Sequence, residues 1–127
     1  MNFFFDNNLS EKLAQAMHLL DAENVVEHLR ERFQQDAKDE DWLQYVGERE
    51  LILVTRDQKI TKRTAELLAY RRYDVGAFIL TGKKLGRWQQ IKQLICAWEE
   101  MGALAAGTCR PYAYQVPPKG KIKPIGL

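Results

Sequence analysis

The chain has 127 residues, enough for one domain with a hydrophobic core, and its 46% hydrophobic and 28% charged residues are typical of globular proteins. No apolar run is long enough to cross a bilayer, and residues 1–6 do not resemble a secretory leader, so we expect neither. Residues 1–50 carry 12 acidic and 5 basic side chains, whereas residues 51–127 carry 5 acidic and 14 basic ones. An acidic half that holds a cation and a basic half that holds phosphate would suit a nucleic-acid enzyme, although two solvated faces can also simply differ in charge.

The N-terminal part of the chain alternates between a strand pattern and a helix pattern. Residues 2–5 are short, apolar and aromatic, which predicts a strand. Apolar residues at helical spacing predict a helix over residues 9–20, with Asn8 as its N-cap and Glu11 in the capping-box position. A second strand is predicted to begin at Val25 and to reach Leu29.

The middle of the chain contains the clearest strand. Residues 33–38 form a polar connection, after which Asp39 is predicted to cap a short helix that ends at Gly47. Residues 51–55, with the sequence Leu-Ile-Leu-Val-Thr, form the apolar run that a central parallel strand requires. Thr61 is predicted to cap the helix that follows, and its inward side chains are expected to be Ala65, Leu68 and Ala69.

The C-terminal half continues this alternation. Strands are predicted over residues 76–80 and 112–116, and residues 119–123 are predicted to form an exposed basic tail. The strongest amphipathic helix lies between these strands, with apolar positions Trp88, Ile91, Leu94, Ile95, Trp98 and Met101. The only cysteines, Cys96 and Cys109, form no Cys-x-x-Cys pair, so we expect Cys96 to be a buried free thiol and the protein to be cytoplasmic.

The alternation of strands and helices predicts the fold class. It indicates a three-layer α/β/α domain with a mostly parallel central sheet. The sequence has no internal repeat and no linker, so we expect one domain over residues 1–127, with a core at about 2–104 and a basic extension at about 108–127.

Three aspartates are expected near one edge of this sheet. Asp6 and Asp57 each follow a predicted strand, and Asp39 opens the acidic stretch Asp39-Glu40-Asp41 ahead of the second of these strands. In open α/β sheets the ligand crevice lies at the carboxyl ends of the strands, and gathered carboxylates repel one another unless a hard cation or protons compensate. Each aspartate alone is better explained as a helix cap or a turn residue, but this explanation is weaker for all three together at the same edge of one sheet. His18 and His28 are isolated, which argues against zinc.

The ordered series of motifs resembles a known family. Phe-Phe-Phe-Asp6-Asn-Asn-Leu-Ser, Val-Val-Glu-His-Leu, Asp39-Glu-Asp-Trp and Val-Thr-Arg-Asp57-Gln-Lys-Ile together resemble the PIN-like domains, over residues 2 to about 100. Within that family the series is most similar to the compact subgroup grouped with VapC-type toxins of bacterial toxin–antitoxin pairs. Tyr112-Ala-Tyr-Gln-Val-Pro and the lysine tail also resemble this subgroup.

The resemblance implies a metal-dependent ribonuclease. It implies that Asp6, Asp39 and Asp57 are the catalytic acids and hold Mg²⁺ or Mn²⁺ for the cleavage of an RNA substrate. Longer PIN domains carry a further helical glutamate that this chain does not obviously contain, and Glu40 or Asp41 is the candidate to replace it. The resemblance also implies a cognate antitoxin protein as partner, and a possible homodimer.

Several basic residues follow the predicted strand ends and are candidates to bind the RNA backbone; they are Arg56, Lys59, Lys62, Arg63, Lys83, Lys84 and Arg87. Three alternatives remain open from sequence. The chain can be a catalytically degenerate PIN-like binding module, a DNA-directed nuclease, or a phosphoacceptor receiver-like domain in which Asp57, Thr81 and a lysine act together. The single acid at the end of the first strand, where a receiver has an acidic pair, argues against the receiver.

Overall fold

Short apolar strands and amphipathic helices alternate along the protein, as the sequence pattern predicts. The computed structural model describes residues 1–58 and 64–127. Its elements in chain order are β1 (Asn2–Phe5), α1 (Glu11–Leu20), β2 (Val25–His28), the 3₁₀ turn Leu29–Glu31, α2 (Asp39–Glu48), β3 (Ile52–Thr55), α3 (Thr64–Arg72), β4 (Gly76–Leu80), α4 (Arg87–Gly107), β5 (Tyr112–Val116) and β6 (Lys123–Ile125). The predicted fold class is confirmed.

The strands form one six-stranded sheet in the order β2-β1-β3-β4-β5-β6. The first five strands are parallel, and β6 pairs antiparallel with β5. The order reverses between β1 and β3, because β1 is followed in sequence by β2 on one side while the chain then crosses to β3 on the other side. In open α/β sheets this switch point is where ligands bind, outside the carboxyl ends of the strands.

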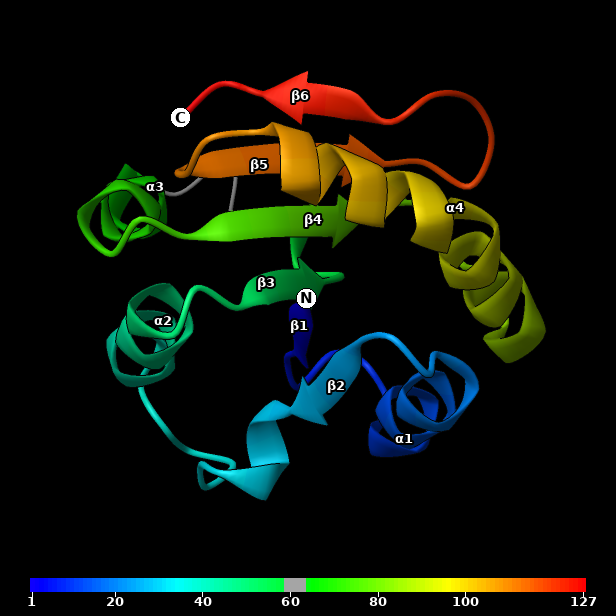
Figure 1. Cartoon of the computed structure of the whole chain (residues 1–127), viewed down its shortest axis with the longest axis horizontal. Helices are drawn as coiled ribbons and strands as arrows, with labels where there is room; N and C mark the ends of the chain where they lie inside the picture. Colours follow the sequence, from blue (N-terminus) through cyan, green and yellow to red (C-terminus); the bar gives the residue numbers. More distant parts are fainter. Residues whose placement is uncertain (59–63) are drawn as a thin grey trace.

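Helices cover both faces of the sheet (Figure 1), with α1 and α4 on one face and α2 and α3 on the other. Side chains alternate along each strand, so Phe3 and Phe5 pack toward α1 and α4 while Phe4 packs toward α2 and α3. Each face therefore has its own apolar cluster. Among the described residues, none of the helices has the length and apolarity that a bilayer crossing requires.

The helix ends differ from the prediction in three places. Ser10, not Asn8, is the N-cap of α1, because its side chain accepts a hydrogen bond from the N–H of Lys12 at 3.1 Å. Asp39 is the first residue inside α2 and Lys38 is the N-cap, so the predicted capping role of Asp39 is wrong. Gly47 lies inside α2 and does not end it.

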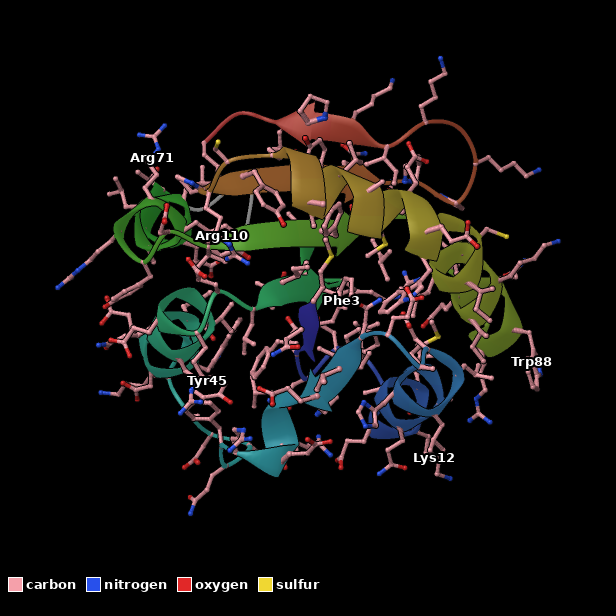
Figure 2. All side chains as sticks on the ribbon, in the orientation of Figure 1. Phe3, Lys12, Tyr45, Arg71, Trp88 and Arg110 are labelled. Carbon is pink, nitrogen blue, oxygen red and sulfur yellow. The ribbon has the colours of Figure 1, made fainter. Side chains whose placement is uncertain are left out.

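Several predicted inward positions are exposed. Ala69 is buried as predicted, whereas Ala65 and Leu68 face solvent. On α4, Leu94, Trp98 and Met101 are buried, but Ile95 is half exposed. The remaining two errors concern Trp88, which projects outward near the start of α4 (Figure 2), and Cys96, a free and exposed thiol. The buried residues of α4 begin only at Gln93, so the first turns of the helix do not contribute to the core.

The predicted cap of the preceding helix, Thr61, lies outside the described residues.

Two features complete the last part of the chain. Lys119, Lys121 and Lys123 are exposed as predicted, but Lys123 also begins β6, so the end of the basic tail is ordered into the sheet. At the opposite, amino edge of the sheet, the guanidinium of Arg110 donates to the carbonyls of Glu50 and Leu51 at 2.7 and 2.8 Å. The Arg110 side chain therefore joins the segment before β5 to the segment before β3.

Candidate metal centre

Asp6 lies at the switch point, directly after β1, and its side chain points to the same face of the sheet as Phe4 because the two are two residues apart. Thr55 ends the neighbouring strand β3, and its hydroxyl donates to Asp6 Oδ2 at 2.5 Å. The N–H of Asn8 donates to Asp6 Oδ1 at 3.2 Å. Both carboxylate oxygens of Asp6 are therefore oriented by hydrogen bonds.

A network of short contacts joins the loop after β1 to the loop after β3. Asn8 Oδ1 lies 3.0 Å from the hydroxyl of Thr55 and accepts from the N–H of Arg56 at 3.1 Å. The N–H of Asp57 donates to the oxygen of Thr55 at 3.0 Å. Thr55 therefore fixes Asp6 and Asp57 relative to each other. Sequence reasoning missed this role, although the Thr-x-Asp spacing at a strand end was visible.

The carboxyl group of Asp6 is held in an unfavourable place for a negative charge. Asp6 is only 4% exposed. Burial raises the pKa of Asp6 from 3.8 to about 7, against the opposing effect of the hydrogen bonds from Thr55 and Asn8. The charges of Asp57 and Asp39 raise this pKa further. A positive charge beside Asp6 would offset both the cost of burying its negative charge and the repulsion from Asp57 and Asp39.

Asp57 and Asp39 approach Asp6 from different elements. Asp57 is partly buried after β3, whereas Asp39 is exposed in the first turn of α2. The indole N–H of Trp42, one turn later on α2, donates to Asp39 Oδ1 at 3.2 Å and so orients its carboxylate. Glu40 and Asp41 are exposed in the same first turn, and their suggested role as a replacement acid stays a prediction.

Two residues of α3, which the sequence analysis did not select, also belong to this region. Glu66 lies in the first turn of α3, and Tyr70 follows it by four residues on the same helix face. After burial, the charges of Asp6, Glu66, Asp57 and Asp39 all raise the pKa of the Tyr70 hydroxyl, so all four carboxylates are near enough to act on it. We refer to Asp6, Asp39, Asp57 and Glu66 as the acidic site. In the sequence, the only indication of these two residues was the Glu-x-x-x-Tyr spacing ahead of two arginines.

Arg56 points to the other face of the sheet, toward α4. Its guanidinium donates to the side-chain oxygen of Gln93, and burial lowers the pKa of Arg56 from its ordinary value. Gln93 in turn donates to the carbonyls of Thr81 and Val116 at 2.7 and 3.0 Å. A single buried glutamine thus connects the carboxyl ends of β3, β4 and β5. Hydrophobic periodicity carries no signal for such a residue.

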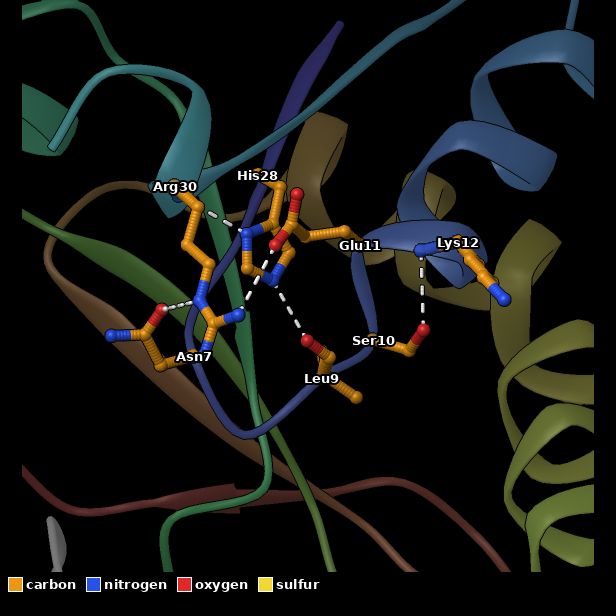
Figure 3. Close-up of polar contacts among 7 residues, drawn as sticks. All are labelled: Asn7, Leu9, Ser10, Glu11, Lys12, His28 and Arg30. Carbon is orange, nitrogen blue, oxygen red and sulfur yellow. Dashed lines mark hydrogen bonds and ion pairs between the residues drawn. The ribbon is translucent and has the colours of Figure 1, made fainter. Parts of the chain in front are cut away.

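His28 contacts the loop after β1 and stabilises it (Figure 3). The ring of His28 is buried; its Nε2 lies 2.7 Å from the carbonyl oxygen of Leu9, and its Nδ1 accepts from the N–H of Arg30 at 3.1 Å. The Arg30 side chain then donates to Asn7 at 3.3 Å and pairs with Glu11 at 3.2 Å. These contacts give the isolated histidine a structural role beside the acidic site.

The candidate RNA-binding residues divide into three groups. Lys83, Lys84 and Arg87 are exposed after β4, at the same carboxyl edge of the sheet as Asp6. Arg56 is partly buried against Gln93. The remaining three, Lys59, Lys62 and Arg63, lie outside the described residues.

The donor atoms of the acidic site are carboxylate, amide and hydroxyl oxygens, which suit a hard cation. Within residues 1–58 and 64–127, no three His, Cys, Asp or Glu side chains form a ready-made ligand cluster. Mg²⁺ commonly keeps several water ligands and binds through one or two carboxylates, so a loose group of acids around a buried Asp6 fits a hydrated ion. The residues present are therefore compatible with Mg²⁺ or Mn²⁺.

Comparison with known proteins gives one clear match. The family model described as "PIN like domain" matches residues 1–82, which are 82 of the 127 residues and include β1 to β4 and the whole acidic site. No curated protein and no solved structure matches the chain. The family match agrees with the parallel sheet and with the acids at its carboxyl edge, and the chain therefore belongs to the PIN-like domain family.

Proposed function

We propose that this PIN-like protein is a Mg²⁺- or Mn²⁺-dependent endoribonuclease. PIN-like domains are generally nucleases and typically depend on a divalent metal. The observation that carries the proposal is the buried carboxyl group of Asp6, which lies at the switch point of the sheet with the charges of Asp57 and Asp39 acting on it. Such an arrangement of acids is stabilised by a bound cation.

In this proposal the acidic residues bind the metal ion and the basic residues bind the RNA. Asp6, Asp39 and Asp57 hold the ion, and Glu66 is the candidate for the further helical acid of longer PIN domains. Bound Mg²⁺ or Mn²⁺ lowers the pKa of a coordinated water and neutralises charge on the phosphodiester. Thr55 keeps the carboxylate of Asp6 in a fixed orientation by its hydrogen bond at 2.5 Å.

Basic side chains at the same edge of the sheet hold the substrate in this proposal. The RNA backbone is bound by three exposed residues after β4, namely Lys83, Lys84 and Arg87. The exposed Asp41 helps to orient the water that attacks the phosphodiester. In the sequence Arg56, Lys59, Lys62 and Arg63 follow β3, and they stay candidates to bind the RNA backbone. Phosphate contacts of this kind give affinity without sequence specificity.

The order of the motifs supports a more specific biological role. We propose that the protein is a VapC-type toxin of a type II toxin–antitoxin pair, acts in the cytoplasm and is inhibited by a cognate antitoxin protein. The exposed thiols of Cys96 and Cys109 suit a reducing compartment. Homodimer formation belongs to the same proposal.

The substitution Asp6→Asn tests the nuclease proposal. It keeps the size and the hydrogen-bonding shape of the side chain but removes the negative charge that holds the cation. We expect Mn²⁺-dependent cleavage of RNA to be lost while the circular dichroism spectrum is unchanged. Cleavage is measured on a pool of labelled RNAs, with and without a chelator.

A matched control is Asp74→Asn, at the amino edge of the sheet just before β4. Asp74 has a positive φ of 60°, a conformation that asparagine also adopts readily. This variant should cleave as the wild-type protein does. Full cleavage by Asp6→Asn would remove Asp6 from the site and overturn the assignment.

One observation favours a second candidate, a degenerate PIN-like module that binds without cleaving. The described residues contain no ready-made cluster of three metal-ligating side chains. A protein of this kind would bind neither Mn²⁺ nor Mg²⁺ at millimolar concentration. Isothermal titration with each ion separates this candidate from the nuclease.

A further inference from the structure

The hydroxyl of Tyr70 is a buried polar group that has no hydrogen-bond partner among the described residues. Tyr70 is 0% exposed, and its oxygen makes no hydrogen bond within the described part of the chain. Buried hydroxyl groups are nearly always hydrogen-bonded in folded proteins, because leaving one unpaired carries the full cost of its desolvation. The lone hydroxyl therefore indicates a partner that residues 1–58 and 64–127 do not supply.

The surroundings of this hydroxyl narrow the choice of partner. The ring of Tyr70 packs with Phe4 and Leu53, the inward residues of β1 and β3 that precede Asp6 and Thr55 on the same face of the sheet. After burial, the largest influence on the hydroxyl is the charge of Asp6, followed by those of Glu66, Asp57 and Asp39; together they raise the pKa of Tyr70 well above its ordinary value. The hydroxyl thus stays neutral and lies against the acidic site.

A hydrated cation can supply the hydrogen-bond partner that the Tyr70 hydroxyl lacks among the described residues. A water whose oxygen coordinates a divalent cation is a strong hydrogen-bond donor and needs an acceptor on its outer side. A neutral tyrosine oxygen is such an acceptor. Outer partners of this kind orient what the ion holds, and their loss commonly weakens metal affinity.

We propose that Tyr70 is a positioning residue of the metal site, and that its hydroxyl accepts a hydrogen bond from a water in the hydration shell of the bound divalent cation. The inference rests on the metal site of the proposed function. It does not require that the protein cleaves RNA, because it concerns the binding of the ion. It also explains how an acidic site with few close ligands holds a hydrated ion in one place.

The substitution Tyr70→Phe tests this role, since it removes one oxygen atom and keeps the buried ring. We expect the affinity for Mn²⁺ to fall roughly 10-fold, the lower end of the loss seen for outer partners of metal sites. The full-length protein is titrated with Mn²⁺ and the free ion is followed by electron paramagnetic resonance. The melting temperature in a chelator should stay the same or rise, because an unpaired buried hydroxyl has been removed.

The chain offers a matched control in Tyr112→Phe. The hydroxyl of Tyr112 is also buried and has no hydrogen-bond partner in the described residues, but it packs over Gly76 in β4, on the face of the sheet that α1 and α4 cover. In a chelator this variant should behave as Tyr70→Phe does. Its affinity for Mn²⁺ should equal that of the wild-type protein.

The outcomes separate this inference from the nuclease proposal. Equal Mn²⁺ affinity in Tyr70→Phe and wild type, or a melting temperature in chelator lowered by several degrees, would overturn the positioning role even if RNA is still cleaved. Weaker Mn²⁺ binding in Tyr70→Phe alone, together with no cleavage of any RNA by the wild type, would sustain the role and overturn the nuclease. A wild-type protein that binds no Mn²⁺ would overturn the inference outright.

Discussion

At the scale of single residues, the buried carboxyl group of Asp6 links the stability of the protein to pH. The pKa of Asp6 is raised from 3.8 to about 7 in the folded protein, so between about pH 4 and pH 7 the folded state keeps a proton that the unfolded chain has lost. The metal-free protein therefore loses stability as the pH rises through this window, by on the order of 4 kcal/mol from this group. Above pH 7 the contribution is constant.

Chemical denaturation in a chelator at pH 5 and at pH 8 measures this effect. Asp6→Asn does not titrate, so the difference between its stabilities at the two pH values should be smaller than that of the wild-type protein. Adding Mn²⁺ at pH 8 should restore stability to the wild type and not to the variant. Two parallel pH profiles would mean that Asp6 titrates normally in the folded protein.

At the scale of elements, α2 and the end of α3 approach so closely that only glycine fits at position 47. A Cβ added to Gly47 would lie 1.9 Å from the carbonyl oxygen of Tyr73. Gly47→Ala should therefore lower the free energy of unfolding by about 1–3 kcal/mol, as overpacking does, although alanine is the better helix former. Urea denaturation measures the change.

Gly102→Ala is the control for this prediction. Gly102 lies inside α4, and an added Cβ there meets no atom within 4 Å. Alanine should stabilise this position by about 1 kcal/mol. If the two variants changed stability in the same direction, helix propensity and not the contact with Tyr73 would control position 47.

The elements also show what the sequence could predict. The strands at residues 2–5, 76–80 and 112–116 were predicted with their bounds, because apolar runs of this length have few other uses. The ends of the helices were not, since Ser10 and Asn8 are both good caps and only the tertiary path of the chain selects one of them. The strand β6 was missed because its three residues pair with β5 and carry no apolar pattern of their own.

The positions of Asp6 and Asp57 in the sheet were predicted for the same physical reason. Asp6 and Asp57 follow strands, and the structure places them after the paired parallel strands β1 and β3, at one edge of the sheet. Thr55, Glu66, Tyr70 and Gln93 were not selected. Their contribution depends on which helix crosses which strand end, and neither spacing nor residue type in the sequence determines that crossing.

At the scale of the whole molecule, the uneven charge distribution predicts salt-dependent RNA binding. Lys83 and Lys84 are exposed at the carboxyl edge of the sheet, beyond the acidic site. Each phosphate contact to a single strand contributes about 0.7 to the slope of log K against log salt, so Lys83→Gln with Lys84→Gln should reduce that slope by about 1.4. Fluorescence anisotropy of a labelled RNA at several salt concentrations measures the slope, with a catalytically inactive protein.

Arg71→Gln with Arg72→Gln serves as the control of equal charge change. These arginines end α3 and lead to the amino edge of the sheet; Arg71 extends outward at the far end of the molecule from Trp88 (Figure 2). Their loss should leave the slope unchanged. An equal reduction in both double variants would indicate general attraction to the basic half and no defined RNA path.

The position of β1 in the middle of the sheet has a consequence for synthesis on the ribosome. The strand β1 precedes both of its neighbours, β2 and β3, along the chain, and its pairing with β3 joins Phe3 to Ile52. A nascent chain can close only the side of β1 that faces β2 until residue 55 has emerged. During that interval one edge of three consecutive phenylalanines has open backbone groups, and both Thr55 and the orientation that it imposes on Asp6 are absent. The metal centre thus cannot form before Thr55 and Asp57 have been translated.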